Sequence, residues 1–319
     1  MERDIQIRNV RPGDILGMTR VVLAARGLRG AELEVQMERD LARFNRQDLV
    51  ETIESESLVA MLGARMIGVW RYGEFDRDVH LTRPEIDPLV QEVSQESVRD
   101  AFLRDFWPHL SPVVNRAIYV DYPSPKGLLG EHLLRRGFDR QVTRTDMVID
   151  LKESVASTTD RLTFVTYNED VHERFLRAFC RSFEGSLDPA MDWDARHPEQ
   201  SFHLFRDRFG VLDPGVWVLA TDRDGRDVGF ALFQHLTAGR YAGQTMLLYT
   251  AVLPEARGQG YGEEIVREGL KRVRERRGSQ EKVALTVSDP NEPARRIYER
   301  VGFVPTERFS LYVATRPNL

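Results

Sequence analysis

The sequence predicts an α/β protein built from two similar units, and three observations support this prediction. Short apolar strands alternate with amphipathic helical segments along the 319 residues. The order helix end, glycine and strand occurs in both halves, at 134–151 and at 299–315. The chain is longer than one ordinary domain, and its 41% apolar composition is enough for two hydrophobic cores.

The repeat continues upstream as a hairpin in each half. Residues 58–70 and 216–232 each read as two short strands with a glycine in the second strand. The polar stretch 152–160, rich in serine and threonine, is expected to join the halves. We therefore predict a first domain at 1–155 and a second domain at 156–319.

The most informative motif is Arg257-Gly258-Gln259-Gly260-Tyr261-Gly262, between the apolar run 246–252 and an amphipathic segment that ends at Gly278. This order predicts a strand, a tight glycine turn and a helix. Glycines allow backbone N–H groups to approach a ligand closely, and the helix N-terminus adds partial positive charge. The motif therefore predicts a site for the pyrophosphate of a cofactor.

Two common nucleotide-binding motifs do not fit this loop. A dinucleotide fingerprint that begins at Gly258 requires a glycine where Glu263 stands. A P-loop requires Lys and then Ser or Thr after its last glycine, whereas Gly262 is followed by Glu263 and Glu264. These two carboxylates would repel a nucleoside triphosphate. The remaining pattern is Arg-x-x-Gly-x-Gly.

With Asn291-x-x-Ala294 and Tyr298-x-x-x-Gly302-Phe303 downstream, this pattern resembles the acyl-CoA pocket of the GCN5-related N-acetyltransferases, over about the last seventy residues. The arrangement in two units is similar to that of mycothiol synthase within this family. The resemblance implies two acetyltransferase-like units, each a mixed, mainly antiparallel twisted sheet flanked by helices. It also implies acetyl-CoA as the cosubstrate.

The resemblance assigns roles to residues of the second unit. Tyr298 matches the tyrosine that protonates the departing CoA thiolate, and a free phenol with a pKa of about 10 is protonated at cellular pH. Asn291 caps the last helix, contacts the CoA arm, or does both. The other cofactor contacts are expected from strand amides and the glycine loop: Ala251, Val252, Arg257, Gly258, Gln259, Gly260, Tyr261 and Gly262.

The first unit lacks these features at the corresponding positions. An alignment of the two Pro-Glu pairs leaves residues 86–91 without a glycine, so a phosphate cradle cannot form there in the same way. An alignment of the two Gly-Phe pairs places Leu133 at the position of Tyr298 and Lys126 at that of Asn291. We predict that the first unit has kept the fold and lost the chemistry.

The general base that would accept the amine proton is not assigned by the sequence. The strand at 245–250 contains no carboxylate, which leaves the hydroxyls of Tyr249 and Thr250, or water relayed to a more distant carboxylate. His235 is interpreted as a partly buried polar residue. The stretch 188–203 reads as a surface loop with further candidates: Asp192, Trp193, Asp194, His197 and His203.

Composition excludes several other classes of protein. The single cysteine, Cys180, rules out an internal disulfide and is interpreted as a packing residue; no metal is predicted, because no ligand spacing is recognisable. A net charge of -5 argues against a nucleic-acid partner. No apolar run approaches the ~20 residues of a membrane span, and no signal-peptide pattern is present, so a cytoplasmic protein without membrane contact is expected.

We predict that the protein transfers an acetyl group from acetyl-CoA to a primary amine of a small molecule, by direct attack in a ternary complex. No cysteine or serine motif near the loop indicates a covalent intermediate. A monomer or homodimer is expected, and a protein N-terminus or lysine is the alternative acceptor. A CoA-binding sensor or interaction protein without turnover is the alternative class. The missing strand carboxylate favours that class, whereas Tyr298 and the glycine loop favour the enzyme.

Overall fold

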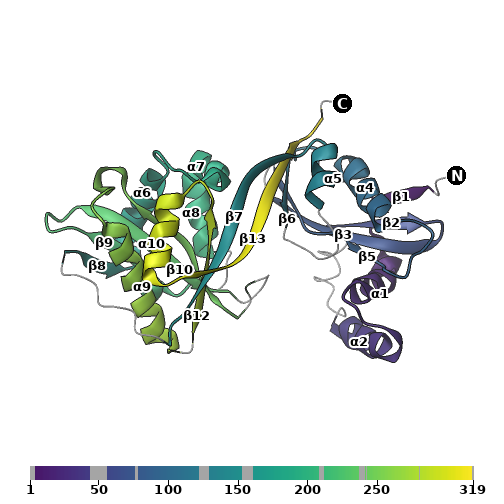
Figure 1. Cartoon of the computed structure of the whole chain (residues 1–319), viewed down its shortest axis with the longest axis horizontal. Helices are drawn as coiled ribbons and strands as arrows, with labels where there is room; N and C mark the ends of the chain where they lie inside the picture. The colour runs from purple at the N-terminus through teal and green to yellow at the C-terminus, as the bar shows by residue number, and fades with distance from the viewer. Residues whose placement is uncertain are drawn as a thin grey trace. The chain divides into compact units, whose positions relative to one another are not determined.

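The chain folds into two compact units, residues 1–141 together with 309–319, and residues 142–308. The computed structural model describes residues 4–43, 56–75, 78–121, 129–152, 161–207, 212–236, 241, 243–279 and 281–317. Residues 153–160 of the predicted linker, and Lys126, lie outside these ranges. Each unit is a mixed, mainly antiparallel sheet flanked by helices, which confirms the predicted fold class (Figure 1).

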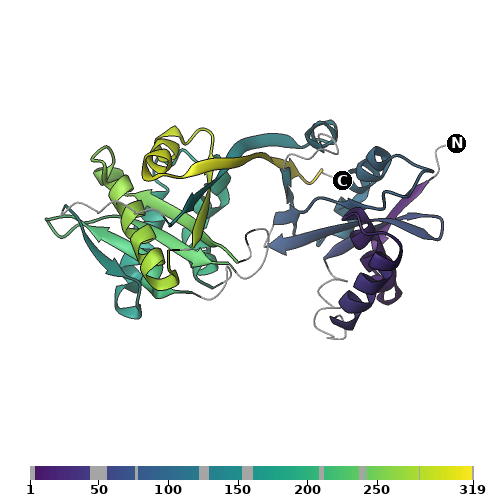
Figure 2. The same ribbon diagram turned by 60° about the horizontal axis from the view of Figure 1, so that its bottom comes forward.

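The sheet of the first unit has the strand order β1-β2-β3-β4-β6-β13, in which only β4 and β6 run parallel among the described pairs. Helices α1, α2, α4 and α5 belong to the same unit and can be followed by their colours in Figure 2. The elements are β1 Ile5–Asn9, α1 Ile15–Ala25, α2 Gly30–Arg43, β2 Ser57–Leu62, β3 Arg65–Phe75, β4 Asp78–Leu81, β5 Glu85–Ile86, α4 Gln95–Asp105, β6 Arg116–Asp121, α5 Leu129–Arg135 and β13 Val304–Thr315.

The sheet of the second unit has the order β7-β12-β11-β10-β9-β8, with β11 and β12 parallel. Helices cover both faces: Phe230 of β10 packs against Phe179 of α6, whereas Phe233, three residues further on, lies against Gly269 of α9. The elements are β7 Asp139–Asp150, β8 Thr163–Thr166, α6 His172–Ser182, α7 Asp192–Arg196, α8 Pro198–Asp207, β9 Trp217–Thr221, β10 Asp227–His235, β11 Thr245–Val252, α9 Tyr261–Arg277, β12 Lys282–Ser288 and α10 Glu292–Val301.

The final strand of each unit comes from the other half of the chain. Strand β7 follows α5, but its residues 144–150 pair with β12 in the second unit. Strand β13 follows α10, and its residues 310–315 pair with β6 in the first unit. The compact units therefore differ from the predicted domains 1–155 and 156–319 by an exchange of final strands. A local sequence pattern specifies that a segment is a strand but not which sheet it joins.

The predicted repeat is present in the two hairpins. Gly68 of β3 and Gly229 of β10 each lie opposite an alanine of the preceding strand. At both positions a helix approaches closely: an added Cβ would lie 3.0 Å from Phe102 of α4 at Gly68, and 2.7 Å from Ile265 of α9 at Gly229. Helix α4 is thus the counterpart of α9, the helix that follows the glycine loop.

The two helix ends also correspond. The amide of Phe138 donates to the carbonyl of Leu133 at 3.0 Å after α5, and that of Phe303 donates to Tyr298 at 2.9 Å after α10. The glycine before each phenylalanine has a positive φ, of 80° and 113° respectively. Leu133, which is fully buried, therefore occupies the position of Tyr298, as predicted. A hydrocarbon side chain cannot donate a proton, so the first unit lacks this acid.

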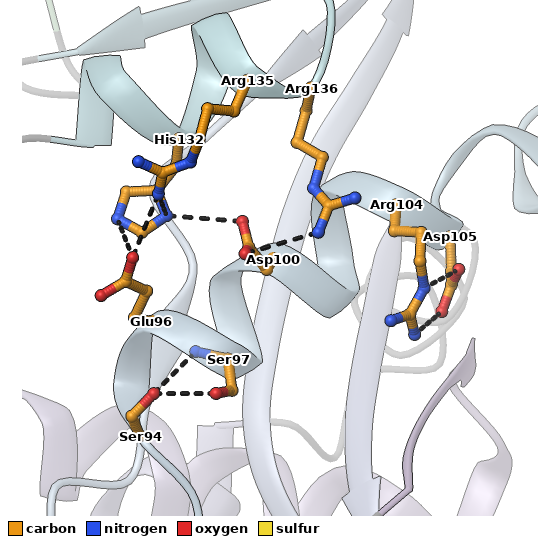
Figure 3. A network of polar contacts seen from close by, with 9 residues as sticks. All are labelled: Ser94, Glu96, Ser97, Asp100, Arg104, Asp105, His132, Arg135 and Arg136. Carbon is orange, nitrogen blue, oxygen red and sulfur yellow. Dashed lines mark hydrogen bonds and ion pairs between the residues drawn. The ribbon is translucent and has the colours of Figure 1, made fainter. Parts of the chain in front are cut away.

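In the first unit, polar contacts join α5 to α4 (Figure 3). His132 is buried, with Nε2 3.4 Å from Glu96 and Nδ1 3.4 Å from Asp100. Arg135 reaches Glu96 at 3.0 Å, and Arg136 reaches Asp100 at 3.4 Å. Both carboxylates belong to α4, so these pairs fix the packing of the two helices.

We expect Gly229→Ala to destabilise the second unit by about 1–3 kcal/mol, because the added methyl group collides with Ile265 and with the carbonyl of Ala251. Chemical denaturation followed by circular dichroism measures the loss. Gly13→Ala is the matched control, since an added Cβ there meets nothing within 4 Å. Equal midpoints for the two variants would contradict the packing role of Gly229.

Candidate active site

A cavity of about 650 Å³ opens in the second unit where two parallel strands separate. Strands β11 and β12 pair only at Thr245 and Met246, although β11 continues to Val252. Beyond these pairs, residues 247–252 of β11 and 285–287 of β12 line the cavity. The separation exposes backbone groups of β11 that a continuous sheet would bond to its neighbour.

The direction of these backbone groups follows from the pairing with β10. The amide of Leu253 donates to Val228 at 2.9 Å, and antiparallel pairing alternates along the strand. Ala251 therefore directs its amide to β10, whereas Thr250 and Val252 direct theirs to the opposite side, toward the gap. Of the two strand amides predicted as ligand contacts, that of Val252 is in position, and Ala251 lines the cavity without offering its amide.

The glycine loop opens on the same cavity. Gly258 and Gly260 have φ values of 81° and 80°, a region that costs other L-residues about 1–2 kcal/mol. Gly260 directly precedes α9, so the partial positive charge of the helix N-terminus is directed at the loop. The lining residues here are Gly258, Gly260, Tyr261 and Gly262. Gln259 is not among them, and its carbonyl accepts from Arg161 Nη1 at 3.1 Å.

The two glutamates that follow the loop are neutralised by arginines from distant parts of the chain. Arg300 donates to Glu263 at 3.0 Å, and this hydrogen bond holds the pKa of Glu263 below its usual range. Arg161 pairs with the buried Glu264. The repulsion of phosphate groups that these carboxylates would otherwise cause is therefore compensated. Arg296 and Arg300 also line the cavity and make this end suitable for anions.

Arg257 lines the cavity, but its donors are directed at backbone carbonyls. They reach Val252 at 3.2 Å, Ser182 at 3.0 Å and Gly185 at 3.3 Å. The side chain thus joins the end of β11 to the end of α6. Contact between Arg257 and a pyrophosphate stays a prediction. The positive charge of the side chain supports it, whereas the bonds from its donors to backbone carbonyls argue against it.

We expect Arg161→Met to raise the dissociation constant of CoA about tenfold. The substitution removes the bond to the Gln259 carbonyl and the ion pair with Glu264 beside the loop, effects of about 1–2 kcal/mol at a half-exposed site. Calorimetric titration with CoA measures the change. Arg226→Met is the matched control, because the side chain of Arg226 is 74% exposed and, among the described residues, forms an ion pair with Asp224 alone. An unchanged dissociation constant would show that Arg161 does not position the loop.

Helix α10 brings two predicted residues to the cavity. Asn291 caps the helix by accepting from the amide of Ala294 at 3.4 Å, and it also lines the cavity, so both predicted roles are compatible. Tyr298 lines the cavity and is 8% exposed, with its ring packed edge-on against Phe303 at 5.9 Å. Burial raises the pKa of Tyr298 above that of a free tyrosine, which keeps its hydroxyl protonated.

Tyr249 reaches the cavity from the face of the sheet that α6 covers. Ser182 donates to the carbonyl of Phe179 at 2.6 Å, so it accepts from the Tyr249 hydroxyl at 3.2 Å. The ring stacks on Phe183 at 5.5 Å. Burial raises the pKa of Tyr249, and the group is therefore a hydrogen-bond donor rather than the base.

The stretch 188–203, predicted as a surface loop, is largely helical. A short 3-10 turn at Pro189–Met191 leads into α7 and α8. Asp188 lines the cavity, and its Oδ1 accepts from the amide of Ala190 and from the hydroxyl of Ser288. The loop prediction was wrong because α7 and α8 are too short, at 5 and 10 residues, to give a clear helical period.

The other candidates in this stretch do not line the cavity. Asp194 accepts from Ser201, and burial raises the pKa of its carboxyl group. His197 lies 3.1 Å from the Trp193 carbonyl. Asp188, which begins the stretch and was not singled out as a candidate, is the acidic residue of 188–203 that lines the cavity. The remaining candidates, Asp192, Trp193 and His203, also lie outside its lining.

Two other interpretations of single residues are supported. His235 is half-buried, with Nδ1 3.3 Å from the Thr245 hydroxyl and 3.3 Å from Glu281. Cys180 is half-buried in α6, and burial raises its pKa, which disfavours the reactive thiolate. No group of three or more metal-ligating side chains occurs among the residues that the structure describes.

Arg144 is a cavity residue that was not predicted from the sequence. It lies on β7, which was expected to belong to the first unit, and it lines the cavity in the second unit because β7 pairs with β12. The strand exchange is therefore what brings this cation to the site.

The separated strands, the glycine loop at the start of α9 and the tyrosine of α10 lie around one cavity. Residues 174–303 match the acetyltransferase (GNAT) family, and the matched range lies within the second unit.

Curated relatives with sequence similarity are acetyltransferases. The chain is 32% identical over 127 residues to a mycothiol acetyltransferase of Saccharomonospora viridis, which covers 37% of this chain and 40% of that protein. It is 30% identical over 124 residues to a mycothiol acetyltransferase of Arthrobacter sp., with 37% and 38% covered. A 5-NmdU N-acetyltransferase of Pseudomonas phage PaMx11 is 30% identical over 87 residues, or 27% of this chain and 56% of that protein. The chain thus matches about two fifths of the length of the mycothiol acetyltransferases.

Two solved structures share the fold of nearly the whole chain. A GCN5-related N-acetyltransferase from Sphaerobacter thermophilus has a TM-score of 0.64 at 19% identity, with 99% of this chain and 97% of that chain covered. A tandem GNAT protein from the clavulanic acid biosynthesis pathway has a TM-score of 0.59 at 14% identity, with 99% and 100% covered. The chain therefore has a tandem GNAT fold. Within the described residues, no helix has the length and apolar character needed to cross a membrane.

Proposed function

We propose that this protein transfers an acetyl group from acetyl-CoA to a primary amine of a small molecule, by direct attack in a ternary complex. One observation carries the proposal: a single cavity connects the glycine loop with Tyr298 and Asp188 through the gap between β11 and β12. The loop suits a pyrophosphate, and the gap can hold an extended thiol arm. At the other end of the cavity, Tyr298 is a proton donor and Asp188 is a carboxylate.

Each group has a task in this reaction. The loop amides and the N-terminus of α9 bind the diphosphate, and the amide of Val252 polarises the thioester carbonyl. Asp188 binds the incoming ammonium group and takes up its proton through water, after which the amine attacks the carbonyl carbon. Tyr298 gives its proton to the sulfur as the carbon–sulfur bond breaks. No covalent enzyme intermediate is required.

The second unit is proposed to be the catalytic one, and the first unit a degenerate copy. Leu133 replaces the tyrosine, and residues 86–91, before α4, contain no glycine. Calorimetry is expected to detect one CoA site per chain. The relatives named mycothiol acetyltransferase and 5-NmdU N-acetyltransferase support a small-molecule acceptor rather than a protein.

Release of CoA from acetyl-CoA across a panel of small amines tests the proposal. We expect tight CoA binding and turnover of at least one class of amine. Binding without turnover on any amine would favour a CoA-binding sensor, and turnover only on peptide N-termini or lysines would favour a protein acetyltransferase. An absence of CoA binding would overturn the assignment.

A further inference from the structure

Arg144 and Asp188 place opposite charges at the acceptor end of the cavity. On the paired strands β7 and β12, Arg144 lies directly opposite Ser288, and such neighbours have Cβ atoms about 4.5–5.5 Å apart. The hydroxyl of Ser288 donates to Asp188. Both charged side chains line the cavity. A ligand that reaches Tyr298 therefore meets a cation and an anion that are both neighbours of Ser288.

The guanidinium of Arg144 has no partner in the described part of the chain. Its Nε is buried without a hydrogen bond, and no described carboxylate forms an ion pair with it. Arg257 and Arg300 of the same cavity are both bonded, to carbonyls and to Glu263 respectively. Arg144 is half-buried, and because its Nε is buried without a partner, a bound anion that supplies a hydrogen bond there is favoured.

Other features of this end are consistent with an anion bound near the reacting groups. Arg144 and Tyr298 line the same cavity, so an anion bound by the guanidinium shares that cavity with the reacting groups. The lining beside Asp188 includes the apolar side chains of Leu187, Met191 and Leu248 together with the hydroxyl of Ser186. A small amine with an apolar skeleton and one anionic group would satisfy these surroundings.

We propose that Arg144 binds a carboxylate of the acceptor, so that the substrate is a small amine that also carries a carboxylate, such as an amino acid. The inference rests on the proposed acetyl transfer and specifies its acceptor. Asp188 binds the ammonium group and Arg144 the carboxylate, with two parallel N–H···O bonds that suit the planar guanidinium. Arg144 is a specificity residue that acts on substrate binding and takes no part in proton transfer.

Matched pairs of acceptors test this assignment. Each α- or ω-amino acid is compared with its carboxamide, which has the same shape and no negative charge, and kcat/KM is measured by CoA release. For the wild-type protein we expect a preference of about 10- to 100-fold for the carboxylates, the range of charge-assisted hydrogen bonds. In Arg144→Gln the preference is expected to disappear. An amino acid and its carboxamide differ in the basicity of the amine. Comparison of the carboxylate-to-carboxamide ratio of the wild type with that of Arg144→Gln removes this difference.

Three controls keep the result interpretable. Arg144→Lys retains the positive charge but cannot form the bidentate pair of hydrogen bonds, so an intermediate preference for the carboxylates is expected. Arg140→Gln changes an exposed arginine of the same strand that does not line the cavity, and its preference should equal that of the wild type. Calorimetry with CoA shows whether each variant still binds the cosubstrate.

The outcomes separate the inference from the function on which it rests. Equal or better turnover of the carboxamides by the wild-type protein would overturn the acceptor assignment while acetyl transfer stands. A preference for aminoalkyl phosphonates over carboxylates would also overturn it. If CoA binds and only amines outside both series are acetylated, the inference fails and acetyl transfer stands; if no amine of the wider panel is acetylated, the proposed function and the inference both fail.

Discussion

Tyr298→Phe is expected to lower kcat about 100-fold, within the range that general acid catalysis contributes, and to leave the dissociation constant of acetyl-CoA nearly unchanged. The substitution removes one oxygen and keeps the ring packed on Phe303. Without the phenol, no positioned donor protonates the departing thiolate. Steady-state CoA release gives kcat, and calorimetry gives the dissociation constant.

The control for this variant is Tyr167→Phe. The hydroxyl of Tyr167 lies 2.8 Å from His172 Nδ1, on a part of the second unit that does not line the cavity, so kcat should be unaffected.

The pH profile of kcat adds a second criterion. Because burial raises the pKa of Tyr298 above the ordinary value of about 10, wild-type kcat should not fall on the alkaline side below that pH. Retention of most of kcat in Tyr298→Phe would assign the proton to another donor.

The parts of the site that lie in continuous sequence were predictable. The glycine loop and α9 are adjacent in the chain, and Asn291 and Tyr298 stand on one helix with a clear cap and stop. Their spacing is set by the helix period and by backbone conformations that only glycine adopts readily. Such features depend on residues that are close in the sequence, so the sequence pattern predicts them.

The parts that depend on distant pairing were not predictable in this way. Arg161 neutralises Glu264 across 103 residues of sequence, and Arg300 reaches Glu263 across 37 residues. The sequence alone indicated two repulsive carboxylates. Arg144 was missed for a similar reason, since nothing in the pattern of β7 specifies that it pairs with β12.

Asp188 illustrates an intermediate case. The stretch that it begins was expected to hold possible bases, but the named candidates were Asp192, Trp193, Asp194, His197 and His203, and not Asp188 itself. The fold separates them, because the hydroxyl of Ser288 on β12 holds Asp188 at the cavity while Asp194 turns to Ser201 on α8. Three-dimensional position, rather than residue type, therefore selects the carboxylate.

Gly260→Val is expected to raise the dissociation constant of CoA at least about 100-fold, equivalent to a loss of roughly 3 kcal/mol. A β-branched residue is a severe outlier at a φ of 80°, so the loop must change its conformation or carry strain. Either change moves the backbone amides at the start of α9 away from the diphosphate, and the new side chain occupies space beside them. Titration with CoA and with acetyl-CoA measures the loss.

Gly225→Val separates this effect from backbone strain in general. Gly225 has a φ of 78° in the turn between β9 and β10, and an added Cβ there meets nothing within 4 Å. It carries the same conformational penalty outside the cavity, so it should lower stability and leave the affinity for CoA intact. Equal losses of affinity in the two variants would indicate general destabilisation. Normal CoA binding by Gly260→Val would show that the diphosphate does not bind at this loop, and the proposed site would have to be abandoned.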